Sequence, residues 1–303
     1  MSQLWDEAAQ QLVTVRDHIR FAVSAFDRHD VFFGHGFPGP VEEASYLVLH
    51  ALGLSHEERS LWLDARLLPE ESVAVLDLVR RRVEKRLPAA YLTHEAWLGP
   101  FRFYVDERVI VPRSFIAEAL EEGLDPWIDD FESLEHVADI CTGGGSLAVL
   151  LALKCPHAQV DAVDLSPEAL AVAERNVSDY GLEDRIQLIQ GDLFEGLTPG
   201  AYELIVSNPP YVDEKAMQAL PAEYRHEPHV ALASGTDGLD HVKRLLWEAP
   251  RYLEPGGWLV MEVGHQRPLL EDAFPDIPWV WLDLPGGDSY VFLVRREDLP
   301  GAS

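Results

Sequence analysis

The chain has 303 residues, 47% of them hydrophobic, which allows two domains and a sizeable core. Its net charge is -28, with 24 basic against 52 acidic residues, so its surface disfavours nucleic-acid backbones. Attraction of a basic partner and adaptation to a saline host explain this acidity equally well. The sequence has no long apolar run and does not begin like a signal peptide, and Cys141 and Cys155 indicate no disulfide framework. A cytoplasmic protein is therefore expected.

The first third of the chain has helical periodicity. Apolar residues recur at helical spacing between Leu12 and Phe26, and further helices are expected over 42–52 and 70–86. The second of these carries a basic cluster, Arg80-Arg81-Arg82, which is typical of a solvated helix face. Residues 1–95 are therefore predicted to form a helical domain.

The pattern changes near residue 96. Residues 97–105 read as a β-hairpin, and Val109-Ile110-Val111 is a further extended run that Pro112 stops. We expect residues 96–113 to form a hairpin linker that joins the helical domain to the rest of the chain.

Short strands and helices alternate after residue 113. Strands are expected over 137–140, 159–164, 185–190, 202–207, 257–263, 279–282 and 290–295, with helices over 147–153, 167–180 and 239–253. This alternation predicts an α/β, doubly wound sheet over residues 114–303. In such sheets ligands bind at the carboxyl ends of the strands, near the point where the strand order reverses.

The first of these strands leads into a glycine-rich loop. Its residues are Asp139, Ile140, Cys141, Thr142, Gly143, Gly144 and Gly145. Successive glycines let the backbone approach a ligand closely, and the helix that follows offers N–H groups to an anionic group. Glycine turns also join strands to helices where no ligand binds, so the loop alone is a weak signal.

Acidic residues follow the next two strands. Asp164 lies about twenty residues beyond the glycines, where a carboxylate accepts hydrogen bonds from ribose hydroxyls. It is not needed as a helix N-cap, because Ser166 before Pro167 fills that role better. Asp192 and Leu193 combine an acid with an apolar side chain, which suits an adenine base. A dinucleotide enzyme is the alternative, although contiguous glycines depart from its usual G-x-G-x-x-G spacing.

The fourth strand is followed by Asn208, Pro209, Pro210 and Tyr211. The prolines fix the backbone, and the Asn208 side chain and the Pro209 carbonyl provide two acceptors for the hydrogens of a planar NH2 group. Tyr211 can lie flat against that group. The tetrapeptide therefore favours methylation of an amide or amino nitrogen by S-adenosylmethionine over the alternative that the prolines only end a strand.

Several blocks resemble the HemK-like glutamine methyltransferases over nearly the whole chain. They are residues 104–109, 111–114, 161–164, 223–228 and 232–239, together with the tetrapeptide. The resemblance implies a class I (Rossmann-like) methyltransferase sheet that binds S-adenosylmethionine through residues 141–145, Asp164, Leu193 and Asn208. It also implies that residues 208–211 hold a glutamine, that Arg113 binds the substrate by shaping the entrance together with Glu118, and that the N-terminal helices recognise a protein substrate.

Within this family, Ser114 after Arg113 favours the branch that modifies a large-subunit ribosomal protein. The branch that modifies release factors usually has proline there, and release-factor methylation is the alternative. Phe115 and Gly144 depart from the usual pattern, but neither removes a side chain with an expected catalytic role. The acidic surface suits a basic ribosomal protein, and contact of residues 80–82 with ribosomal RNA is an alternative to a solvated face.

Two other classes of function compete with this prediction. A DNA adenine or cytosine methyltransferase uses the same tetrapeptide, but it needs base flipping and a basic groove, which a charge of -28 disfavours. A non-enzymatic ribosome assembly factor that binds the cofactor is the second. His226 and His229 lack a third ligand at zinc spacing, so no metal site is expected.

Overall fold

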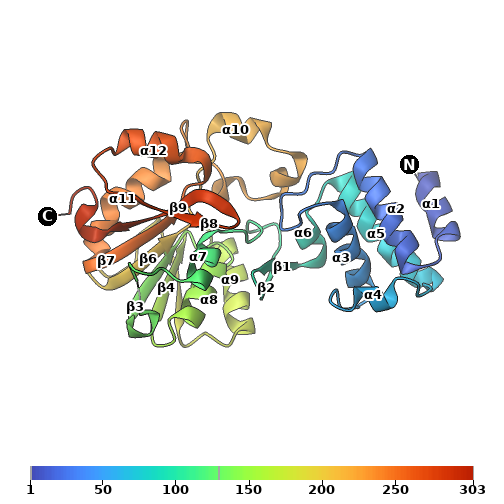
Figure 1. Ribbon diagram of the computed structural model, residues 1–303, viewed down its shortest axis with the longest axis horizontal. Helices are drawn as coiled ribbons and strands as arrows, with labels where there is room; N and C mark the ends of the chain where they lie inside the picture. The colour runs from blue at the N-terminus through green and yellow to red at the C-terminus, as the bar shows by residue number, and fades with distance from the viewer. Residues whose placement is uncertain (1, 129, 303) are drawn as a thin grey trace. The chain divides into compact units, whose positions relative to one another are not determined.

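The computed structural model describes residues 2–128 and 130–302, so residues 1 and 303, the outer bounds expected for the two domains, lie outside the described residues. The chain divides into two compact units (Figure 1). The first comprises Met1–Glu95 and Pro221–His226, and the second comprises Ala96–Leu220 and Glu227–Ser303. Within the described ranges, no helix combines the length and the apolar character that a membrane crossing requires.

The first unit is helical. Its helices are α1 (Ser2–Gln11), α2 (Val15–Arg28), α3 (Pro40–Ala51), α4 (Arg59–Trp62), α5 (Pro69–Lys85) and α6 (Ala89–Thr93). A capping box begins α2, because Thr14 and Asp17 each accept a hydrogen bond from the other's backbone N–H. The helices bury one apolar core that includes Phe26, Leu47 and Val79.

Residues 80–82 on α5 were expected to form a solvated helix face, and this prediction is wrong for Arg82. Arg82 is 1% exposed, and its guanidinium donates to Glu43 Oε1 at 2.6 Å and to Glu223 Oε1 at 3.1 Å. A guanidinium is buried only when paired, and here two carboxylates supply the pairs. Arg80 by contrast is exposed and pairs with Asp77 on the same helix.

The hairpin after the helices is shorter than the expected linker. Strands β1 (Glu95–Leu98) and β2 (Phe101–Tyr104) form a two-stranded sheet. The further extended run predicted at Val109–Val111 is not a strand. The backbone of this run hydrogen-bonds to a side chain and not to a neighbouring strand, because the Val111 N–H donates to Glu227 Oε1 at 2.9 Å.

A seven-stranded sheet forms the second unit, in the order β5-β4-β3-β6-β7-β9-β8. The strands are β3 (His136–Ile140), β4 (Gln159–Asp164), β5 (Ile186–Gln190), β6 (Tyr202–Ser207), β7 (Leu253–Glu262), β8 (Val280–Leu284) and β9 (Gly287–Arg295). Strands β3 to β7 are parallel, and β9 runs antiparallel to both of its neighbours. This topology confirms the predicted Rossmann-like fold class.

Helices cover both faces of the sheet (Figure 1). Helices α7 (Ile116–Glu122), α8 (Ser146–Lys154) and α9 (Pro167–Asp179) pack on one face, and α11 (Asp240–Tyr252) and α12 (Arg267–Ala273) on the other. Neighbouring strand residues point to opposite cores, as Val137 and Ala138 do. Between β6 and α11 lie α10 (Glu214–Ala219), η2 (Ala222–His226) and η3 (His229–Ala231); the other 3-10 turns are η1 (Phe131–Ser133), η4 (Gly264–Gln266) and η5 (Arg296–Asp298).

Candidate active site

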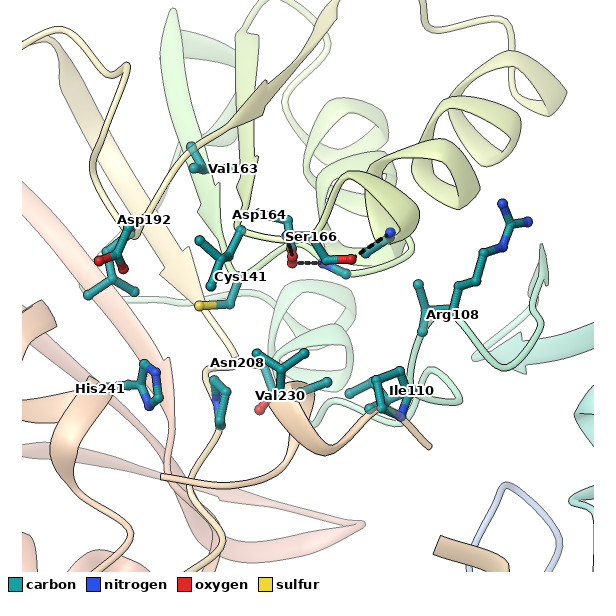
Figure 2. A pocket seen from close by; sticks show the side chains of 18 of the residues that line it. Arg108, Ile110, Cys141, Val163, Asp164, Ser166, Asp192, Asn208, Val230 and His241 are labelled. Atoms are coloured by element: carbon teal, nitrogen blue, oxygen red, sulfur yellow. Dashed lines mark hydrogen bonds between the residues drawn. The ribbon is translucent and has the colours of Figure 1, made fainter. Parts of the chain in front are cut away.

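A pocket of about 700 Å³, its open mouth included, lies at the carboxyl ends of the parallel strands (Figure 2). The chain leaves β3 toward β4 on one side and reaches β6 on the other, so the strand order reverses beside this pocket. Seven of the predicted site residues line it: Cys141, Gly143, Asp164, Asp192, Leu193, Asn208 and Pro210. The structure thus brings the glycine loop, both strand-end acids and the tetrapeptide together.

The glycine loop turns sharply after β3. Cys141, Gly143 and Gly145 have φ angles of 62, 54 and 78°, a region that favours glycine. A Cβ on Gly145 would lie 3.0 Å from the Ala173 Cβ, so this glycine allows close packing against α9. Gly144 accepts a hydrogen bond from Asn176 Nδ2 at 2.8 Å. Of the described loop residues, Cys141 and Gly143 line the pocket, whereas Gly144 and Gly145 hold the loop in place.

Asp139 and Thr142 form a buried pair beneath this loop. The Thr142 hydroxyl donates to Asp139 Oδ2 at 2.6 Å, and Asp139 is 0% exposed. Burial raises the pKa of Asp139 to about 7, against the lowering effect of the Thr142 hydrogen bond. Both residues were expected to bind the cofactor. Neither is among the described residues that line the pocket, and their hydrogen bond instead supports the loop.

Asp164 joins the loop to the second strand. Its Oδ2 accepts from the Gly143 N–H at 2.8 Å. Its Oδ1 accepts from the Ser166 N–H at 2.9 Å, and Figure 2 shows these two residues side by side. Burial raises the pKa of Asp164, while these backbone donors oppose the change. Ser166 caps α9 by accepting from the Ala169 N–H, which confirms the assignment of the N-cap.

Asp192 and Leu193 form another wall of the pocket. The carboxylate of Asp192 accepts two 3.1 Å hydrogen bonds from the guanidinium of Arg244, a pairing that the sequence did not reveal. Leu193 adopts a positive φ of 55° and is 5% exposed. Leu165, which also lines the pocket, is 57% exposed, so an apolar side chain faces the open space.

The tetrapeptide lies where β6 ends beside β3. The Ser207 hydroxyl donates to the Ile140 carbonyl at 2.7 Å, which fixes the start of the tetrapeptide against the first strand. Asn208 and Pro210 line the pocket. Tyr211 is not among the described residues that line the pocket, and its hydroxyl donates to Glu262 Oε1 at 3.2 Å. Pro209, which lies between Asn208 and Pro210 in the chain, is not among the described residues that line the pocket.

Arg113 pairs with Glu227. Its guanidinium donates to both carboxylate oxygens, at 2.8 Å to Oε2, and the same carboxylate receives the Val111 N–H. Glu227 is 5% exposed, so the pair is largely desolvated. Arg113 thus connects the segment after the hairpin to the segment before η3. It was expected at the entrance, but it is not among the described residues that line the pocket.

Of the 19 described residues that line the pocket, 12 were not predicted from the sequence. The missed residues are Arg108, Val109, Ile110, Val163, Leu165, Ser166, Ala169, Gly191, Pro228, Val230, Ala231 and His241. Four of them, Arg108, Val109, Val163 and Pro228, lie in the blocks that carry the family resemblance, which was a usable signal. His241 had none, because it lies on α11, far along the chain from the loop and the tetrapeptide.

Two protein families match parts of the chain. "Methyltransferase small domain" matches residues 112–224, and "PrmC N-terminal domain" matches residues 30–93. The first match includes the tetrapeptide and 12 of the 19 described residues that line the pocket, and the second lies within the helical unit.

Curated relatives match nearly the whole chain, and each carries the name ribosomal protein uL3 glutamine methyltransferase. The relative from Neisseria gonorrhoeae is 54% identical over 298 residues, which is 98% of this chain and 99% of the relative. That from Bordetella pertussis is 56% identical, over 96% and 97%. That from Bradyrhizobium diazoefficiens is 46% identical, over 95% and 92%. Identity of this extent shows that the chain is a HemK-like methyltransferase and belongs to the family of ribosomal protein uL3 glutamine methyltransferases.

Proposed function

We propose that this enzyme transfers a methyl group from S-adenosylmethionine to the side-chain amide nitrogen of a glutamine in ribosomal protein uL3. One observation carries the proposal. Asn208 of the tetrapeptide lines the same pocket as Asp164 and the glycine loop, so an acceptor for an NH2 group adjoins the residues that suit a nucleoside. The relatives named for this reaction match both units of the chain and support the choice of substrate.

The pocket fits S-adenosylmethionine. Asp164 is a half-buried carboxylate in the pocket wall that suits two ribose hydroxyls, and a Cβ at Gly143 would meet no described atom within 4 Å, which leaves room for a close ligand. Leu165 and Val230, both more than half exposed, offer apolar surface to a flat base. We infer that these residues, with Leu193, hold the nucleoside. When bound, the cofactor supplies an electrophilic methyl group.

The tetrapeptide addresses the weakness of an amide nitrogen as a nucleophile. Its lone pair is delocalised into the carbonyl, so it must be oriented and localised before it attacks. The side-chain oxygen of Asn208 and the carbonyl of Pro209 accept the two N–H hydrogens, and Tyr211 lies against the amide plane. This arrangement needs no strong base, since the proton leaves late. Positioning of this kind contributes about 7–11 kcal/mol in well-oriented reactions.

Charge and location support a ribosomal protein as the partner. A net charge of -28 complements a basic protein and disfavours DNA. A substrate of this kind is consistent with the cytoplasmic location expected from the sequence. The proposal assigns Arg82 no contact with ribosomal RNA, because that side chain is buried in ion pairs. The helical unit, which carries the second family match, is the part proposed to recognise the substrate.

The test is methyl transfer by the purified enzyme from labelled S-adenosylmethionine to four substrates offered separately. These are unmethylated uL3, a release factor, intact large ribosomal subunits and duplex DNA. We expect label in uL3, placed on one glutamine by mass spectrometry, and its loss with Asn208→Ala. Label confined to the release factor or to DNA would refute the proposal. Full rescue of ribosome assembly in cells by Asn208→Ala would favour an assembly role.

A further inference from the structure

A buried carboxylate lies directly behind the tetrapeptide. Glu262 is the last residue of β7 and is 2% exposed. Its Oε2 accepts from the Ser114 hydroxyl at 2.6 Å and from the Phe115 N–H at 2.9 Å. Its Oε1 accepts from the Tyr211 hydroxyl at 3.2 Å. One carboxylate therefore connects the segment before α7 to the tyrosine of the tetrapeptide.

The rest of Tyr211 is confined as well. A Cβ on Gly264 would lie 2.8 Å from Cε2 of the tyrosine ring, so the ring packs directly on this glycine. The backbone carbonyl of Tyr211 accepts from Gln266 Nε2 at 3.2 Å. A Cβ on Gly238 would lie 2.5 Å from that carbonyl oxygen. Ring, carbonyl and hydroxyl each have a defined neighbour, which leaves little freedom for the plane of the ring.

A carboxylate in this place is costly to stability. Burial raises the pKa of Glu262, while the hydrogen bonds from Ser114, Phe115 and Tyr211 and the nearby charge of Arg113 oppose that change. Replacing a buried ionic group by apolar residues is often neutral or stabilising, so stability alone does not account for a glutamate here. A satisfied buried polar network does, however, specify one arrangement of its members.

We infer that Glu262 is a positioning residue for methyl transfer, which sets the plane of the Tyr211 ring through the tyrosine hydroxyl. Ser114 acts through the same carboxylate, by holding its other oxygen. The inference rests on the proposed function, because the ring plane matters only if an amide lies against it. Glu262 itself touches neither the amide nor the pocket; it acts on the reaction through Tyr211.

The experiment compares Glu262→Gln, Tyr211→Phe and the double variant with the wild-type enzyme, using labelled S-adenosylmethionine and uL3. Each variant is assayed for kcat, for KM toward uL3 and for cofactor Kd by calorimetry, whose stoichiometry gives the folded fraction. We expect Glu262→Gln to lower kcat on the order of 10²-fold, as a small misplacement does, with cofactor Kd unchanged. The double variant should be no slower than Tyr211→Phe alone, because both changes break one interaction.

Tyr202→Phe is the matched control. Tyr202 is a buried tyrosine whose hydroxyl also donates to a carboxylate, Asp161 Oδ2 at 2.6 Å, but neither residue lines the pocket. It should lower the thermal midpoint and leave kcat unchanged. If Glu262→Gln does not fold, Tyr211→Phe and Ser114→Ala decide, since each breaks one bond to an intact Glu262 and should lower kcat.

The outcomes separate the two proposals. Wild-type enzyme that transfers no methyl group to uL3 refutes the proposed function. Active wild type with an unchanged kcat in Glu262→Gln, or with fully additive effects in the double variant, refutes the positioning role while the proposed function stands.

Discussion

The Gly143 N–H donates a 2.8 Å hydrogen bond to Oδ2 of Asp164, so the acid of the second strand organises the glycine loop of the first. The other oxygen of the same carboxylate accepts from the Ser166 N–H. Asp164 thus fixes both strand ends while it faces the pocket. Two sequence signals about twenty residues apart are in fact parts of one structure.

Asp164→Asn is expected to weaken cofactor binding strongly. The asparagine side chain keeps one oxygen acceptor. Its NH2 group replaces the other oxygen, and it then faces either a backbone N–H donor or a ribose hydroxyl, neither of which it can pair with as the carboxylate does. Hydrogen bonds to charged groups contribute about 1.5–3 kcal/mol, so Kd for S-adenosylmethionine should rise by roughly 10- to 100-fold. Calorimetry measures this. Asp161→Asn, on the same strand but outside the pocket lining, serves as the control, and an equal loss of affinity in both variants would contradict the assignment.

Asp139 predicts a pH dependence of stability. Burial raises its pKa to about 7, above the unfolded value of 3.8. The native state therefore holds its proton more tightly, and the stabilisation is complete below 3.8 and lost as pH rises through about 7. Asp139→Asn removes this titration and should gain stability relative to wild type as pH rises across that window. Denaturant unfolding at several pH values checks this, and a constant difference between the two proteins would refute it.

The fold and the pocket's centre were predictable because they depend on strand ends. The glycine loop, Asp164 and Asn208 each follow a recognisable apolar strand, and parallel topology brings such ends together. Contacts between distant segments were not predictable. Arg82 was predicted to be exposed because its partner Glu223 lies 141 residues away in the chain and is not visible in the local pattern. The loss of the strand at Val111 depends on Glu227, 116 residues away.

The pair of Arg113 and Glu227 should be necessary for the stability of the second unit. Removing one partner of a desolvated pair typically costs about 3–5 kcal/mol, and Arg113 is partly exposed, which favours the lower end. Arg113→Ala should therefore lower the thermal midpoint clearly. Arg113→Lys should recover only part of it, because an ammonium group cannot form two parallel hydrogen bonds. Full recovery by lysine would show that charge alone matters.

Glu223 should stabilise the helical unit, although it follows the tetrapeptide in the chain. It is 0% exposed and accepts from Arg82, from Arg86 and from the Phe32 N–H. Glu223→Gln removes a charge from beside a buried guanidinium, so the helical unit should unfold at lower denaturant concentration. Hydrogen exchange in α5, compared with exchange in β3, locates the effect. Equal loss of protection in both elements would contradict a local role.

His241 is expected to contribute to cofactor affinity in a pH-dependent way. It lines the pocket, and its Nδ1 lies 2.8 Å from the Ser234 hydroxyl. Burial lowers its pKa from 6.5, and Arg244 adds to this effect, while Asp192 and Asp240 oppose it. The imidazole is therefore neutral at neutral pH. Protonation below that range places a second cation beside Arg244, where it competes for Asp192.

Cofactor Kd should consequently rise as pH falls below 6.5 in the wild type. His241→Gln remains neutral and should lack this rise, with affinity weakened about fivefold at neutral pH because the amide does not reproduce the placed hydrogen bond between the imidazole and Ser234. Calorimetric titration on both sides of pH 6.5 gives the comparison. His265→Gln is the control, because that ring packs against Tyr290 away from the described lining. If His241→Gln retains the full pH dependence, another group titrates in the pocket.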